Sequence, residues 1–308
     1  MTTALFTHDA ALKHVTPSGH PEQVARMEHL LAALKGKAVR REEAPEAETA
    51  DIELCHPASY IAQIQEASPE EGYVQLDGDT FMSPGSLEAA MRAVGGAIAA
   101  VDLVMTDEVS NAFVAMRPPG HHAETAKPMG FCLFGTVAIA ARHALERHGL
   151  SRVAVVDFDV HHGNGTQDLL WSEARSLFIS SHQMPLWPGS GDPTERGAHD
   201  NVMNVPLAPG TGGVGFRQAY ERDVFPRLEA FSPELILISA GFDAHADDPL
   251  ANLNLREDDF AWVTRSICEI ASRHAAGRVV SCLEGGYDLR ALAASASAHV
   301  DELIAAGT

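Results

Sequence analysis

The chain has 308 residues, a hydrophobic fraction of 45% and a formal net charge of −20 at pH 7. This length is sufficient for one large α/β domain or two small ones, each with a buried core. The excess of acidic residues argues against a protein that binds nucleic acid, whose expected mark is a basic patch. An acidic surface attracts cationic substrates, although it also serves solubility alone.

The N-terminal and cysteine patterns indicate a cytoplasmic protein. Met1–Ala10 has neither the basic region nor the apolar core of a signal peptide. The longest apolar stretch, Phe131–Ala141, is shorter than the roughly 20 residues that cross a bilayer, so we expect no membrane partner. The cysteines are scattered and form no CxxC pair: Cys55, Cys132, Cys268 and Cys282.

Helical patterns alternate with short apolar strands along the chain. We expect helices at Pro21–Leu34, Pro84–Met105, Gly130–His148, Val214–Phe231 and Glu257–Ala276, and strands at Asn111–Met116, Arg152–Asp157, Glu234–Ser239 and Arg278–Leu283. The strands are uniformly apolar, which is typical of strands covered on both faces. The alternation predicts a three-layer α/β/α domain with a mainly parallel sheet.

Each of the four expected strands is followed by polar residues that could carry chemistry. These are His121 and His122, then Asp157, Asp159 and His161, then Asp243, and finally Tyr287. The carboxyl ends of parallel strands meet at one edge of an open sheet, and ligands bind there. The sequence therefore predicts one site built from four strand ends.

The run DFDVHHGNG, which begins at Asp157, indicates a metal site. Alternate residues of an extended segment point to the same side, so Asp159 and His161 can converge on one ion. Oxygen and nitrogen ligands suit zinc, Asp157 could join or support them, and Asp243 is the best candidate for the remaining ligand. Three protein ligands leave a position open for water and substrate. The alternative is that these acids cap helices or hold a structural cation.

A rigid Pro-Pro-Gly turn precedes a pair of histidines, His121 and His122. Imidazole exchanges protons near neutral pH, which suits general acid–base catalysis. Tandem histidines are also common as ordinary surface residues. Asp157 and Asn164 are the candidate partners that would orient the two rings.

The run LEGGY contains a candidate oxyanion donor, the hydroxyl of Tyr287. Gly285 and the glycine after it would let a substrate approach the backbone closely. The alternative is that Tyr287 packs against the start of a helix that Asp288 caps.

The motifs RPPGHH, DFDVHHGNG, SAGFD and LEGGY, in this order, resemble the histone deacetylase superfamily, which includes the acetylpolyamine amidohydrolases. The resemblance extends from His20 to Tyr287 and is strongest to the class II branch and its bacterial deacetylase-like relatives. It implies an arginase/deacetylase-like fold and one catalytic domain over residues 1–308. It also implies zinc-dependent hydrolysis of acetylated lysine side chains with release of acetate.

The resemblance assigns the ions. It makes Asp159, His161 and Asp243 the ligands of one catalytic Zn²⁺. It also implies a structural K⁺ beside the zinc, held with Asp159 and His161 by Asp157, Ser180 and Ser181.

The resemblance also assigns the catalytic roles. His122 matches the general base, and His121 matches its electrostatic or acid partner, which is paired with Asp157. Tyr287 matches the residue that polarises the scissile carbonyl. Asn164 stands where some branches of the family have a second acid, and this departure leaves the proton affinity of His122 open.

The substrate pocket is assigned in the same way. Phe131 and Trp187 match the aromatic walls of an acyl-lysine tunnel, and Gly130 matches a backbone contact within it. Leu250 occupies the rim position where polyamine-specific relatives carry a glutamate. Arg26 matches an arginine that lines an acetate-release channel.

Three alternatives remain open from the sequence. The nearest is a deacetylase of acetylpolyamines or other small acylated amines. The others are a binuclear manganese hydrolase of the arginase type and a non-catalytic acyl sensor or scaffold. The sequence also leaves open the physiological substrate, the acyl-chain preference and whether zinc or ferrous iron fills the site in the cell. The oligomeric state is open too, and a homo-oligomer is possible.

Overall fold

The computed structural model describes residues 2–308 and is organised around one eight-stranded sheet. The strand order is β2-β1-β5-β10-β9-β6-β7-β8, and every neighbouring pair is parallel. The strands are β1 (Thr3–Thr7), β2 (Arg40–Glu43), β5 (Asn111–Val114), β6 (Val153–Asp157), β7 (Ser176–Gln183), β8 (Val202–Leu207), β9 (Leu235–Ala240) and β10 (Val279–Leu283). A separate antiparallel pair is formed by β3 (Val74–Gln75) and β4 (Phe81–Met82).

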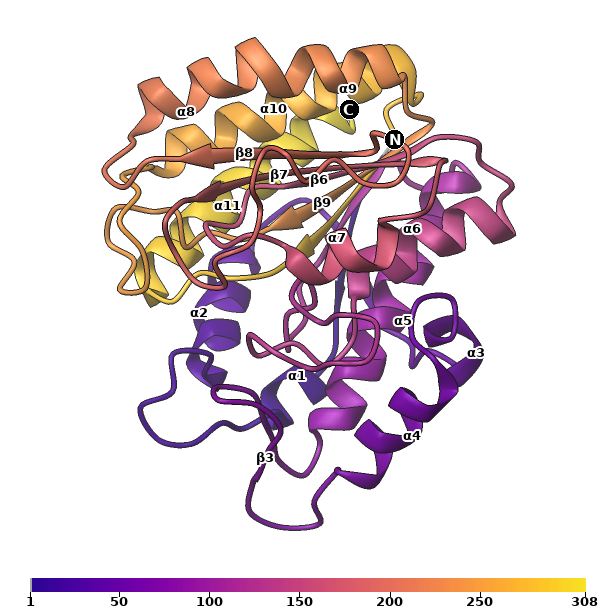
Figure 1. The fold of residues 1–308 in the computed structure, drawn as a ribbon, viewed down its shortest axis with the longest axis vertical. Helices are drawn as coiled ribbons and strands as arrows, with labels where there is room; N and C mark the ends of the chain where they lie inside the picture. Colours follow the sequence, from indigo (N-terminus) through magenta and orange to yellow (C-terminus); the bar gives the residue numbers. More distant parts are fainter. Residues whose placement is uncertain (1) are drawn as a thin grey trace.

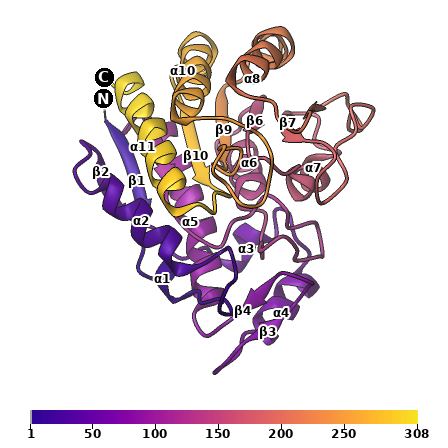
Figure 2. The same cartoon turned by 90° about the vertical axis from the view of Figure 1, so that its left-hand side faces the viewer.

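Helices cover both faces of the sheet (Figures 1 and 2). One layer contains α2, α11, α10, α8 and α9, and the other contains α5 and α6. The helical bounds are α1 (Ala10–Lys13), α2 (Val24–Leu34), α3 (Thr49–Ile52), α4 (Ala58–Glu66), α5 (Ser86–Met105), α6 (Thr136–Arg147), α7 (Asn164–Leu170), α8 (Gly213–Ala219), η1 (Tyr220–Val224), α9 (Phe225–Phe231), α10 (Glu257–His274) and α11 (Leu289–Ala306). The predicted three-layer α/β/α fold with a mainly parallel sheet is confirmed.

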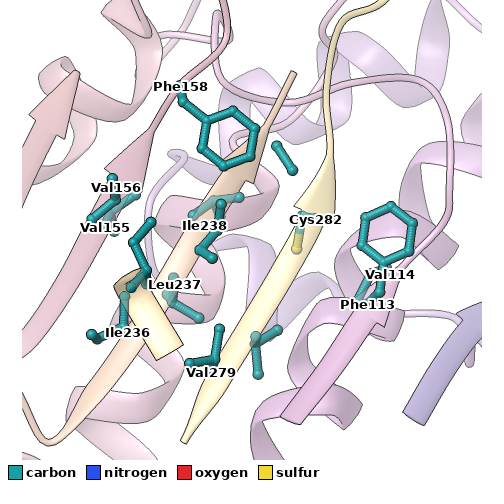
Figure 3. Close-up of a cluster of buried hydrophobic side chains, with 14 of the residues drawn as sticks. Phe113, Val114, Val155, Val156, Phe158, Ile236, Leu237, Ile238, Val279 and Cys282 are labelled. Carbon is teal, nitrogen blue, oxygen red and sulfur yellow. The ribbon is translucent and has the colours of Figure 1, made fainter. Parts of the chain in front are cut away.

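The central strands are apolar on both faces because each face meets a helical layer. Strands β5, β6, β9 and β10 are buried along their full lengths. Figure 3 shows side chains of these strands, among them Phe113, Val155, Ile236 and Val279, within the buried cluster. These four side chains are fully buried, so the sheet provides a rigid base for the loops at its carboxyl edge.

Several of the predicted helix and strand boundaries were wrong, and one of these helices begins beside the predicted active site. The helix predicted at Gly130–His148 begins only at Thr136. Gly130 and Phe131 have φ values of 56° and 69°, in the left-handed region that a helix cannot continue. Within residues 2–308, no helix is both long and apolar enough to span a membrane.

Candidate active site

A cavity of about 370 Å³ opens at the carboxyl edge of the sheet. Six predicted site residues line it together: His122, Gly130, Phe131, His161, Trp187 and Tyr287. Half-buried Leu250 also lines this cavity. The strand ends therefore meet where the parallel sheet requires them to meet.

Asp159, His161 and Asp243 converge beneath this cavity. His161 Nδ1 lies 3.2 Å from Asp159 Oδ1 and 3.1 Å from Asp243 Oδ2. The three ligand atoms lie within 4.8 Å of one another, and all three side chains are buried. Two carboxylate oxygens and one imidazole nitrogen form a set that suits Zn²⁺ and accepts related divalent metals.

The electrostatics of this group favour a bound cation. Burial raises the pKa of Asp243, and the nearby Asp159 carboxylate raises it further. Burial has the same effect on Asp159, but the imidazoles of His121 and His161 outweigh it and hold the Asp159 pKa below its ordinary value. Two adjacent buried carboxylates are costly unless positive charge compensates them, so the residues present fit a metal ion.

Glycine backbone leaves the space that the carboxylates occupy. A Cβ on Gly285 would overlap Asp243 Oδ2 and lie 2.5 Å from Asp159 Oδ2. The Gly285 amide instead donates a hydrogen bond of 2.9 Å to Asp159 Oδ2. The Val160 amide donates one of 2.8 Å to Asp243 Oδ1. Backbone donors thus hold both carboxylates, since the His161 amide also donates to Asp159 Oδ1 at 2.9 Å. Gly285 therefore supports the metal group rather than only a substrate.

The two histidines are held by different partners. His121 Nδ1 lies 2.9 Å from Asp157 Oδ2, and His122 Nδ1 lies 2.7 Å from Asn164 Oδ1. The two rings are adjacent, with centroids 3.9 Å apart. Both predicted orienting pairs are therefore present.

Their environments give the two imidazoles opposite proton affinities. Burial opposes a charge on His121, but the carboxylates of Asp159 and Asp157 outweigh it and hold the His121 pKa well above its ordinary value. Burial and the positive charges of His121 and His161 hold the His122 pKa well below its ordinary value. The pair therefore combines one imidazole of raised pKa with one of lowered pKa.

Tyr287 lines the same cavity as His122 and His161. Its backbone amide donates a hydrogen bond of 2.7 Å to Asp248 Oδ2, and its ring lies 5.8 Å from that of Phe131. Burial raises the pKa of the hydroxyl well above its ordinary value, so it stays protonated and can donate. Asp288 caps α11 by accepting from two backbone amides, so the capping alternative holds for Asp288, while Tyr287 lines the cavity.

The residues matched to potassium also lie together. Asp157 on β6 is the register partner of Ser180 on β7. Ser180 Oγ lies 3.0 Å from His182 Nδ1, and Ser181 Oγ lies 2.8 Å from the Tyr220 hydroxyl. Both hydroxyls have protein partners, and the potassium assignment stays a prediction.

Sequence reasoning missed the role of Glu284. Its buried carboxylate Oε2 accepts from the backbone amides of Gly120 at 2.7 Å and His121 at 3.1 Å. This residue therefore holds the turn that carries the histidine pair. The LEGGY motif contains it, but the charge of a glutamate gives no indication that it bonds a distant backbone.

Sequence reasoning also missed a buried ion-pair network. Glu22 Oε1 accepts from Arg117 Nε at 2.5 Å and from Arg26 Nη1 at 2.8 Å. Arg26 also donates to the carbonyls of Gly286 and Glu284, both at 2.6 Å. Its guanidinium lies 4.9 Å from the Tyr287 ring centroid. The network links the histidine turn to the tyrosine turn.

Comparison with known proteins agrees with this geometry. The family model described as histone deacetylase domain matches residues 20–303. A histone deacetylase-like amidohydrolase of Pseudomonas aeruginosa is 42% identical over 279 residues, covering 88% of this chain and 73% of the relative. A probable deacetylase of Archaeoglobus fulgidus is 36% identical over 298 residues, covering 94% of this chain and 82% of the relative.

A solved structure agrees as well. The crystal structure of the HDA15 HD domain matches with a TM-score of 0.94 and 31% identity, covering 99% of this chain and 88% of that chain. The chain therefore belongs to the histone deacetylase family. This membership confirms the resemblance inferred from the motifs and supports an amide hydrolase activity of the deacetylase type.

The Gly285→Ala substitution should abolish metal binding at the buried group. The added Cβ displaces the Asp159 and Asp243 carboxylates, whereas the backbone of Gly285 is not strained by an L residue. Metal content after dialysis against Zn²⁺ measures the effect. Gly36→Ala is the matched control, because its Cβ would meet nothing within 4 Å. Full zinc content in Gly285→Ala would contradict the assignment.

Proposed function

We propose that this protein hydrolyses the amide of acetylated lysine side chains in peptides or proteins, with Zn²⁺ as cofactor, and releases acetate. The observation that carries the proposal is the placement of the Asp159, His161 and Asp243 group beneath a cavity that Tyr287 and His122 face. Metal ligands, a proton acceptor and an oxyanion donor then surround one reacting carbonyl.

The cavity suits a slender uncharged side chain. Phe131 and Trp187 supply aromatic walls, and the Trp187 ring lies 4.7 Å from that of His122. A Cβ on Gly130 would lie 2.5 Å from His122 Cδ2 and 2.6 Å from the Trp187 ring, so only glycine leaves this passage open. An acetylated amine can extend along these walls to the metal group, and its neutral amide loses little on leaving water compared with an ammonium group.

The metal would be held by Asp159, His161 and Asp243. A bound Zn²⁺ lowers the pKa of a coordinated water and polarises a carbonyl. The amide nitrogen of Asn164 donates to Glu124 at 2.8 Å, which leaves its Oδ1 to accept from His122 Nδ1–H. Nε2 of His122 is therefore free to accept a proton from the attacking water. The Tyr287 hydroxyl donates to the developing oxyanion, and a protonated histidine of the pair supplies the proton to the leaving amine.

The competing functions are less well supported. Leu250 at the rim offers no charge to a polyamine, which favours a peptide over an acetylpolyamine. Within residues 2–308, one group of three metal ligands gathers beneath the cavity, which favours one catalytic ion over a binuclear manganese centre. A scaffold would not require ligands, proton acceptor and tyrosine to be present together. We also propose the potassium site and a cytoplasmic location.

A direct comparison of substrates tests the proposal. We expect an acetyl-lysine peptide to be hydrolysed faster than an acetylated polyamine by zinc-loaded protein, measured as acetate release. Tyr287→Phe should lower kcat by about 10²–10³, because loss of one oxyanion donor typically costs that much. Faster cleavage of the polyamine would refute the substrate assignment alone. Normal turnover by Tyr287→Phe would refute the role of the tyrosine.

The pH profile tests the proton acceptor. His122 must be neutral to act, so kcat/KM falls as the pH drops through its pKa, which lies well below 6.5. Asn164→Asp places a negative charge beside Nδ1, favours the imidazolium and should move this acidic limb upward by about one to three pH units. Asn164→Asp alone removes the hydrogen bond that Asn164 donates to Glu124. The double variant Asn164→Asp/Glu124→Gln is the matched control, because the new glutamine amide can donate to the new aspartate. An unmoved limb in both variants would show that His122 is not the base.

A further inference from the structure

A second group of metal-ligating side chains lies between α5 and α6, away from the cavity. Asp102 lies near the end of α5, His143 lies in α6, and His148 is the C-cap of α6. The Nε2 atoms of both histidines lie 2.7 Å from Asp102 Oδ1. The three ligand atoms lie within 4.8 Å of one another.

This group lies at the opposite edge of the sheet from the active site. Helices α5 and α6 run beside each other (Figure 1) and end just before β5 and β6, so their C-terminal ends lie at the amino ends of the parallel strands. The active-site residues follow the carboxyl ends. A strand of five residues, as in β6, is about 17 Å long at roughly 3.3 Å per residue. The two groups therefore cannot share an ion.

The surroundings of the group favour a cation. The last carbonyls of a helix carry partial negative charge, and α6 ends at the residue before His148, while α5 ends three residues after Asp102. Arg142 lies nearby in sequence, but its guanidinium is paired with Glu146 and Glu173. The chain as a whole carries a charge of −20.

The ring of His143 is oriented with Nε2 toward Asp102. Its Nδ1 atom is buried and has no hydrogen-bond partner within residues 2–308. When a metal takes the Nε2 lone pair, the single proton of the neutral ring lies on Nδ1, and coordination must offset the cost of leaving that N–H without a protein partner.

We propose that Asp102, His143 and His148 form a second site for a divalent transition-metal ion, with Zn²⁺ as its probe, which ties α5 to α6. Two imidazole nitrogens and one carboxylate oxygen are a zinc ligand set. The side chains of Asp102 and His148 are 47% and 22% exposed, so an ion can enter from solvent and keep a water as a further ligand. This site is independent of the proposed hydrolysis.

The test is the zinc content of the full-length protein after equilibrium dialysis against buffered Zn²⁺. We expect two ions per wild-type chain and one ion per chain of His148→Gln. His148 is chosen because it is half-buried and tolerates substitution better than the buried His143. His29→Gln is the matched control and should keep two ions, since this exposed ring contacts only the Ala25 carbonyl of its own helix. One ion in the wild type, or two in His148→Gln, would overturn the proposal.

A second variant separates this site from the active site. Asp243→Ala should retain one ion at the new site, and added Zn²⁺ should raise its Tm. The double variant Asp243→Ala/His148→Gln should bind no zinc and show no rise in Tm. If the double variant shows the same rise as Asp243→Ala, the new site is refuted. If Asp243→Ala binds as much zinc as the wild type, it is the active-site assignment that fails.

Discussion

The burial of two adjacent carboxylates, Asp159 and Asp243, is the constraint on which the site depends. Neither is exposed, and each takes a backbone amide as donor while its other oxygen faces His161. Such a pair is unfavourable unless positive charge compensates it. A divalent cation bound there would provide that compensation, and the same ion would supply the chemistry that the proposed hydrolysis needs.

The remaining features keep these groups in place. The parallel sheet brings the strand ends to one edge, and Glu284 and the Glu22 network fix the turns that follow β5 and β10. The same architecture gives the two histidines pKa shifts of opposite direction, and one faces a carboxylate while the other faces a neutral amide. Pre-organised groups of this kind need little rearrangement during the reaction.

The sequence predicted most of the site because its motifs stand directly after apolar strands. The DFDVHHGNG run led to the metal group, and Asp157 and Asn164 were correctly paired with His121 and His122. The central four strands dominate the apolar pattern, so the other elements were not predicted: strands β1, β2, β3, β4, β7 and β8 and helices α1, α3, α4, α7 and α11. Glu284 was missed because the amides that it accepts from are distant in sequence. Glu22 was missed because Arg117 is also distant, although its other partner, Arg26, is only four residues away. The roles of the site residues and the single domain over residues 1–308 remain predictions.

Removal and return of the metal tests the central claim most directly. The measurement is acetate release from an acetyl-lysine peptide by chelator-stripped protein, before and after titration with Zn²⁺, beside Asp243→Ala treated in the same way. The account predicts that stripped protein is inactive, that the wild type regains activity as zinc binds, and that Asp243→Ala does not. Full turnover by the stripped protein, or full recovery by Asp243→Ala, would contradict it.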